Sequence, residues 1–169
     1  QTHEDVAVLN KDDEQVLALA ETVRARRLYF SRQGRVGAGA SLQDGWLCLE
    51  GDAAARKICA VGDLQVPGPG IVEDALAACA AASALDIGPE PMAEALRGFR
   101  GRAHCMESVA EFDGVRYVND SKATNVFAVR RALEATPGPI ILIAGGRDKR
   151  EDFRGLVALM RERVKALIV

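Results

Sequence analysis

The sequence contains no G-K-T or G-K-S stretch, so it offers no phosphate-binding loop of the P-loop type. Its four cysteines form no C-x-x-C pair, which favours scattered free thiols in a reducing compartment over disulfides or a metal site. No apolar run approaches the roughly 20 residues that span a bilayer, and the first residues do not resemble a signal peptide. These absences favour a cytoplasmic protein without membrane contact.

An excess of charge of one sign is also lacking. Lys and Arg number 22 against 24 Asp and Glu, which gives a net charge of -2 and argues against a nucleic-acid binder. The 169 residues, 49% hydrophobic and 27% charged, suit one medium globular domain or two small ones. The chain opens almost directly on one strand-like run and stops on another, so we expect a piece of a longer protein.

Strand, helix and strand over residues 5–31 predict a parallel βαβ unit. Asp12 or Asp13 is placed to cap the helix, and Arg24 to Arg27 suit its C-terminal end. A hairpin turning at "QDGW" and the strand "RKICAV" would add antiparallel strands. An Ala-rich helix from residue 71 and a helix with Pro91 in its first turn follow. The first part is therefore predicted to be α/β with a mixed sheet.

A basic, Gly-rich stretch at residues 99–103 marks a predicted boundary between domains 1–98 and 99–169. Beyond it we predict a hairpin turning at "FDGV", a helix at 125–136, a buried strand "IILIA", a helix at 152–164 and a strand "KALIV". This alternation is typical of a doubly wound, Rossmann-like α/β domain.

Two polar loops follow consecutive predicted strands of this second domain. The first, "NDSKATN", holds Lys122, and the second, "GGRDKRED", holds Lys149. Loops at the carboxyl edge of one parallel sheet lie close together, beside helix N-termini that attract anions. The two lysines therefore predict a carboxylate or phosphate ligand. The alternative is that Gly145 and Gly146 only turn the chain and that Asp152 caps a helix.

"YVNDSKATN", followed by "ILIAGGRDK", resembles the C-terminal domain of the D-glutamate-adding Mur ligases. "DVAVLNKDDEQV", "DALAACAAASALDI" and "ALRGFRGRAHCMESV" resemble the later central domain and the hinge of the same family. The resemblance spans the chain in order. It implies that residues 1–98 end a central ATPase domain with a mixed sheet, and that residues 99–169 begin a Rossmann-like domain that binds D-glutamate.

The resemblance implies an ATP- and Mg²⁺-dependent amide ligase of peptidoglycan precursor synthesis, acting as a cytoplasmic monomer. The carboxylate of UDP-N-acetylmuramoyl-L-alanine would be phosphorylated, and the amine of D-glutamate would attack the acyl phosphate. Three groups of residues are implied: Lys122 as catalytic; Ser121, Thr124 and Lys149 as substrate-binding; His104, Asn119 and Asp120 as nucleotide-binding. Taken alone, His104 would be an ordinary surface or packed residue.

The sequence departs from the family in several places. Cys105 stands where members usually carry a phosphate-facing arginine. Gly70, Ile71 and Asp74 replace the His-Asn pair and the second Asn that precede the Ala-rich helix. These departures leave open a second hypothesis, a catalytically inactive, ligase-derived binding or structural module. A third, a ligase for another amino acid or polyglutamate, fits "NDSKATN" less well. We expect the 169 residues alone to be inactive.

Overall fold

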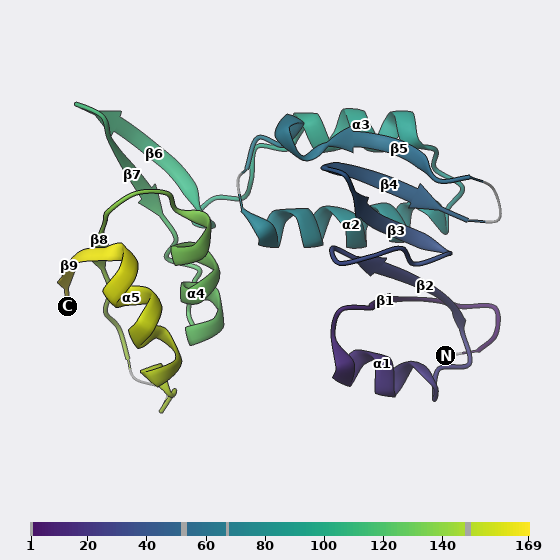
Figure 1. Cartoon of the computed structure of the whole chain (residues 1–169), viewed down its shortest axis with the longest axis horizontal. Coiled ribbons are helices and arrows are strands. Elements are labelled where there is room, and N and C mark those ends of the chain that lie inside the picture. The colour runs from purple at the N-terminus through teal and green to yellow at the C-terminus, as the bar shows by residue number, and fades with distance from the viewer. Residues whose placement is uncertain (1, 52–53, 67, 148–149) are drawn as a thin grey trace. The chain divides into compact units, whose positions relative to one another are not determined.

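The structure is a computed structural model that describes residues 2–51, 54–66, 68–147 and 150–169. It divides into two compact units (Figure 1). The first comprises Gln1–Gln65 and Ile71–Phe99, and the second comprises Val66–Gly70 and Arg100–Val169. None of the described helices is long and apolar enough to cross a membrane.

A mixed five-stranded sheet, in the order β1-β2-β3-β4-β5, forms the frame of the first unit. Its strands are β1 (Val6–Asn10), β2 (Arg26–Ser31), β3 (Gly39–Gln43), β4 (Trp46–Glu50) and β5 (Arg56–Ala60). The first three strands run parallel, whereas β3–β4 and β4–β5 are antiparallel. The β3–β4 turn places Asp44 and Gly45 at φ values of 47° and 78°, as a two-residue hairpin of type I′ requires. The predicted βαβ unit, hairpin and mixed sheet are confirmed.

Helix α1 (Glu14–Ala20) is shorter than predicted. Asp13 is its N-cap and accepts hydrogen bonds from the N–H groups of Gln15 and Val16 at 2.8 and 3.1 Å. The placement of Arg24 to Arg27 at the C-terminal end of this helix is wrong. Arg26 and Arg27 belong to β2, where Arg26 pairs with Val6 of β1, because strand pairing overrides local helix propensity.

Replacing Asp13 with alanine should lower the free energy of unfolding by about 1 kcal/mol, because two N–H groups of the first helical turn lose their acceptor. Urea titration followed by circular dichroism measures the change. Glu14→Ala is the control: it removes an exposed acid from the same turn without removing the cap, and should cost only a few tenths of a kcal/mol. Equal losses in the two variants would contradict the capping role.

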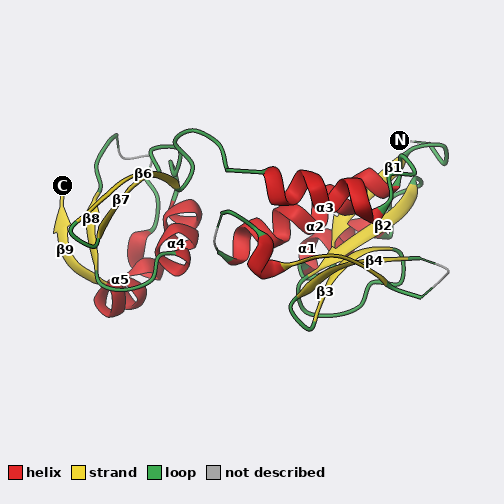
Figure 2. Ribbon diagram, turned by 90° about the horizontal axis from the view of Figure 1, so that it is seen from above, coloured by secondary structure: helices red, strands yellow, loops and turns green. Residues whose placement is uncertain are grey.

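The core of the first unit lies between the sheet and two helices, α2 (Pro69–Ser83) and α3 (Pro89–Gly98) (Figure 2). A one-turn 3₁₀ helix, η1 (Val61–Asp63), links β5 to the segment before α2. Leu47 of β4 and Leu76 of α2 are fully buried, and each contributes roughly 1.5–3 kcal/mol of hydrophobic stabilisation. Alanines on the buried face of α2 permit its close approach to the sheet.

The second unit contains a hairpin and a βαβ unit in separate sheets. The hairpin joins β6 (Glu107–Phe112) to β7 (Val115–Asn119), and α4 (Val126–Ala135) follows it. β8 (Ile140–Ile143) is parallel to β9 (Val164–Ile168), and between them lie the 3₁₀ helix η2 (Phe153–Leu156) and α5 (Val157–Arg163). All the elements predicted here are confirmed, and the protein is α/β throughout.

Two expectations for this unit are wrong. Among the described residues β7 and β8 share no sheet, so the single doubly wound sheet is not formed by them. The strand β8 is also not buried, since Ile141 and Ile143 are 62% and 77% exposed. Successive strand residues face opposite sides, and a continuous apolar run does not reveal which side is covered.

Candidate functional site

The loop between β7 and α4 (residues 120–125, the β7–α4 loop) is held against the segment that precedes β6. The backbone N–H of Lys122 donates to the carbonyl of His104 at 3.0 Å. The N–H of Met106 donates to the carboxylate of Asp120 at 3.0 Å. These bonds fix "NDSKATN" beside the predicted hinge, so the structure brings His104, Asp120 and Lys122 together.

His104 sits in a strained backbone conformation with polar support around it. Its φ of 64° lies in the left-handed region, which few non-glycine residues occupy. The carboxylate of Glu107 accepts the His104 N–H at 2.8 Å and lies 3.6 Å from the ring Nδ1. The side-chain amide of Asn119 lies 2.9 Å from the same Nδ1. His104 is thus positioned by its neighbours, and its role in ligand binding stays a prediction.

The polar side chains of the β7–α4 loop divide into two sets. Asn119 accepts the N–H of Ser121 at 3.1 Å, and Asn125 caps α4 by accepting the N–H of Ala128 at 2.8 Å. These two residues shape the loop. The side chains of Ser121, Lys122 and Thr124 are exposed, and the Lys122 ammonium forms no ion pair with a described residue. The Ser121 hydroxyl and the Lys122 ammonium are groups that this loop offers to a ligand.

The described part of the loop between β8 and η2 (residues 144–152, the β8–η2 loop) reaches the start of α4. The Glu151 carboxylate accepts the N–H of Val126 at 2.6 Å. The two loops therefore meet, although not by the predicted route, because their strands belong to different sheets. Asp152 caps η2 by accepting the N–H of Arg154 at 3.0 Å, as the alternative interpretation of this loop predicted.

Lys149 lies outside the described residues, so its meeting with Lys122 stays a prediction. Glu107 and Glu151 are not among the predicted site residues. The Glu107 carboxylate accepts the backbone N–H of His104. The Glu151 carboxylate accepts the backbone N–H of Val126, which lies 25 residues away in the sequence. The sequence around a single glutamate does not indicate which backbone N–H group its carboxylate will accept.

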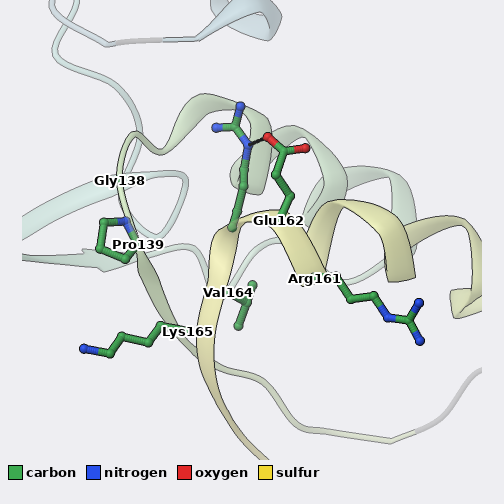
Figure 3. A pocket seen from close by; sticks show the side chains of 7 residues that line it. Gly138, Pro139, Arg161, Glu162, Val164 and Lys165 are labelled. Carbon is green, nitrogen blue, oxygen red and sulfur yellow. Dashed lines mark ion pairs between the residues drawn. The ribbon is translucent and has the colours of Figure 1, made fainter.

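A hollow of about 470 Å³ lies at a different place in the second unit, between the start of β8 and the end of α5 (Figure 3). Arg161 and Lys165 point away from each other (Figure 3). Arg163 Nη1 donates to the carbonyls of Leu133 and Thr136, each at 3.4 Å. Cations in the last turn of a helix complement its dipole, so Arg161 and Arg163 have a structural explanation. We do not assign a ligand to this hollow.

The donor set around His104 and Lys122 suits an anionic ligand, such as the phosphates of a nucleotide or the carboxylates of an amino acid. It consists of an exposed ammonium, two hydroxyls and an imidazole, which lie on the β7–α4 loop and on the segment before β6, two segments joined by hydrogen bonds. Among the described residues, no three His, Cys, Asp or Glu side chains gather closely enough to hold a metal ion.

No family model matches the chain. It is 43% identical over 165 residues to the UDP-N-acetylmuramoylalanine–D-glutamate ligase of Pelotomaculum thermopropionicum, a match covering 98% of this chain and 36% of that protein. The ligase of the same name from Acidobacterium capsulatum is 42% identical over 169 residues, which cover 99% of this chain and 37% of that protein. The chain thus spans a little over a third of the length of these curated relatives.

Solved structures show the same fold at lower sequence identity. MurF from Acinetobacter baumannii superposes with a TM-score of 0.69 at 14% identity, over 97% of this chain and 42% of that chain. A pseudomurein peptide ligase type C from Methanothermus fervidus gives 0.61 at 20% identity, over 80% and 35% of the two chains. Sequence along nearly the whole chain and fold agree, and the chain belongs to the Mur ligase family.

Proposed function

We propose that this chain forms part of an ATP-dependent ligase that adds D-glutamate to UDP-N-acetylmuramoyl-L-alanine through an acyl phosphate, in the cytoplasmic synthesis of peptidoglycan precursors. The observation that carries the proposal is the β7–α4 loop, which exposes Ser121, Lys122 and Thr124 while its backbone is bonded to His104. The relatives that match along the chain are named for this reaction. In this proposal residues 1–98 belong to the ATPase domain and 99–169 to the D-glutamate-binding domain, in an enzyme that works as a monomer.

D-Glutamate carries two carboxylates, and the groups that neutralise them are the side chains of the loops. The N-terminus of α4 contributes little, because Asn125 and Glu151 already accept the N–H groups of Ala128 and Val126. A carboxylate at this helix end also opposes a second anion. We propose that the charge comes from Lys122, with Lys149 as its partner, and that the hydroxyls of Ser121 and Thr124 complete the hydrogen bonds.

The nucleotide would lie beside the segment that precedes β6. Asp120 bonds Met106 through Oδ1, which leaves Oδ2 as an acceptor for a sugar hydroxyl. His104 and Asn119 lie next to it. Bound ATP with Mg²⁺ supplies the phosphoryl group, and the work of these residues is positioning and charge neutralisation. Lys122, between the two sides, would face both the phosphates and the incoming amino acid.

A segment exchange tests the proposed activity. The 165 matching residues of the Pelotomaculum thermopropionicum ligase are replaced with this chain, and incorporation of labelled D-glutamate into UDP-N-acetylmuramoyl-L-alanine is measured with and without ATP. We expect ATP-dependent incorporation by the exchanged enzyme and none by the 169 residues alone. A folded but inactive exchange would favour the inactive module, and incorporation of a different amino acid would favour the third hypothesis.

Lys149→Ala and Thr124→Val in the exchanged enzyme should each raise the KM for D-glutamate about tenfold or more and leave the KM for ATP unchanged. Each variant removes a hydrogen bond to a charged group, which is worth roughly 1.5–3 kcal/mol. Thr136→Val is the matched control, since it makes the same change at the far end of α4. If only the KM for ATP increases, Lys149 and Thr124 bind the nucleotide and not D-glutamate, which contradicts the proposal.

A further inference from the structure

The hydrogen atoms around the ring of His104 can be assigned from its contacts. Asn119 Nδ2 lies 2.9 Å from His104 Nδ1 and 3.4 Å from the Glu107 carboxylate. Asn119 Oδ1 lies 3.1 Å from the N–H of Ser121, which can only donate. The opposite orientation of the amide would set two donors against each other at Ser121 and two oxygens against each other at Glu107. The amide therefore directs its NH₂ group towards His104 and Glu107.

This orientation fixes the tautomer of the ring. One amide hydrogen points to the Glu107 carboxylate and the other to His104 Nδ1, so Nδ1 must be an acceptor. A neutral imidazole that accepts at Nδ1 carries its proton on Nε2. The Glu107 carboxylate does not compete for a proton on Nδ1 at hydrogen-bond distance, since the two atoms are 3.6 Å apart, and it instead accepts the backbone N–H of His104.

We propose that Asn119, supported by Glu107, is a positioning residue that holds His104 as the Nε2–H tautomer, so that its exposed ring presents a hydrogen-bond donor to the ligand. That the acceptor is an oxygen atom of the nucleotide rests on the proposed function. The proposal changes the role expected for Asn119. Its amide is used by His104, Glu107 and Ser121, and it acts on the ligand through His104.

Nitrogen NMR of the imidazole rings tests the tautomer directly on the chain of 169 residues. The chain has two histidines, and His3 is exposed near the N-terminus, so its ring is an internal reference in the same spectrum. In spectra recorded at alkaline pH, we expect a pure Nε2–H pattern for His104 and a mixture of tautomers for His3. The same mixture at both rings would overturn the proposal.

Asn119→Ala should give His104 the same mixture as His3, and Asn119→Asp should shift it towards Nδ1–H, because a carboxylate accepts where the amide donates. Asn125→Asp is the matched control: it places the same charge in the same loop, keeps the cap of α4 and should leave the tautomer unchanged. Backbone amide spectra confirm the fold of each variant. An Asn119→Ala protein with an unchanged His104 pattern would contradict the positioning role.

The exchanged ligase separates this inference from the proposed function. With Asn119→Asp, the KM for ATP should rise about tenfold, and the KM for D-glutamate should stay the same. If the tautomer switches and the KM for ATP is unchanged, Asn119 positions His104 but the nucleotide does not bind beside His104. An unswitched tautomer overturns the positioning whatever the kinetics show.

Discussion

Replacing Lys122 with alanine in the exchanged ligase should lower kcat/KM about 10²- to 10³-fold, the cost of removing one preorganised group that stabilises developing charge. The ammonium of Lys122 is exposed on a loop that two hydrogen bonds hold to the segment before β6, one from the Lys122 N–H to the His104 carbonyl and one from the Met106 N–H to the Asp120 carboxylate. A charge on so constrained a loop needs little reorganisation when an anion arrives. The capped N-terminus of α4 cannot replace it.

Two variants sharpen this prediction. Lys122→Arg keeps the charge but changes its geometry, so it should recover part of the loss. Lys165→Ala removes an exposed lysine of β9 that lies beside the hollow of Figure 3, and it should leave kcat/KM unchanged. Rates are followed by release of inorganic phosphate. A loss of less than about threefold in a folded Lys122→Ala enzyme would remove this residue from the chemistry, by the same scale of effects.

Glu50→Ala should destabilise the first unit by roughly 1–3 kcal/mol, the range for leaving buried hydrogen-bond donors without an acceptor. The Glu50 side chain is 4% exposed, and its carboxylate accepts hydrogen bonds from several donors: the Ser41 hydroxyl, the N–H groups of Val36 and Gly37 at 3.1 and 3.2 Å, Gln43 at 3.1 Å and Arg35 at 3.3 Å. Removing the carboxylate leaves these donors unsatisfied and releases the β2–β3 connection. Urea titration of the variant measures the loss.

The same carboxylate gives the stability a pH dependence. Burial raises the pKa of Glu50, but the hydrogen bonds from Ser41, Val36 and Gly37 outweigh it and hold the pKa below its ordinary value. A carboxyl with a lowered pKa in the folded state stabilises the protein above its unfolded pKa, and this contribution is lost as the pH falls through the folded value. The urea concentration at the unfolding midpoint of the wild type should therefore decrease as the pH is lowered below about 4.5. The midpoint of Glu50→Gln should decrease less over the same pH range.

Glu94→Ala is the control for both measurements, since it removes an exposed glutamate of α3 and should change stability by less than about 0.5 kcal/mol. An equal loss in Glu50→Ala would show that the buried network contributes nothing beyond a surface charge. Parallel midpoints for wild type and Glu50→Gln across acid pH would show that the carboxylate is not ionised in the fold.

Local chemistry made much of the fold predictable. Both hairpins turn on an Asp-Gly pair, at Asp44 and at Asp113, because the turn needs two residues at positive φ. The caps at Asp13 and Asp152 depend on bonds to residues two or three positions away. Where the deciding contact is local in sequence, sequence reasoning located it.

The failures come from contacts between distant segments. Nothing near Arg26 shows that it pairs with Val6, and nothing in "IILIA" shows which face of β8 is covered. Glu50 ends an apolar strand, and its partners come from the β2–β3 connection and from β3. In the candidate site, the sequence located the residues of the β7–α4 loop but not Glu107, because the role of Glu107 exists only once the chain has folded onto it.

The contact between Glu151 and Val126 has a thermodynamic consequence. The Glu151 carboxylate, in the β8–η2 loop, accepts a backbone N–H from the first turn of α4, and α4 begins where the β7–α4 loop ends. A movement of either loop therefore changes the energy of the other. Two sites joined in this way obey reciprocity: whatever free energy a molecule on one loop adds to binding at the other is returned in equal measure. Affinity for the proposed D-glutamate and order in the β7–α4 loop are therefore linked quantities.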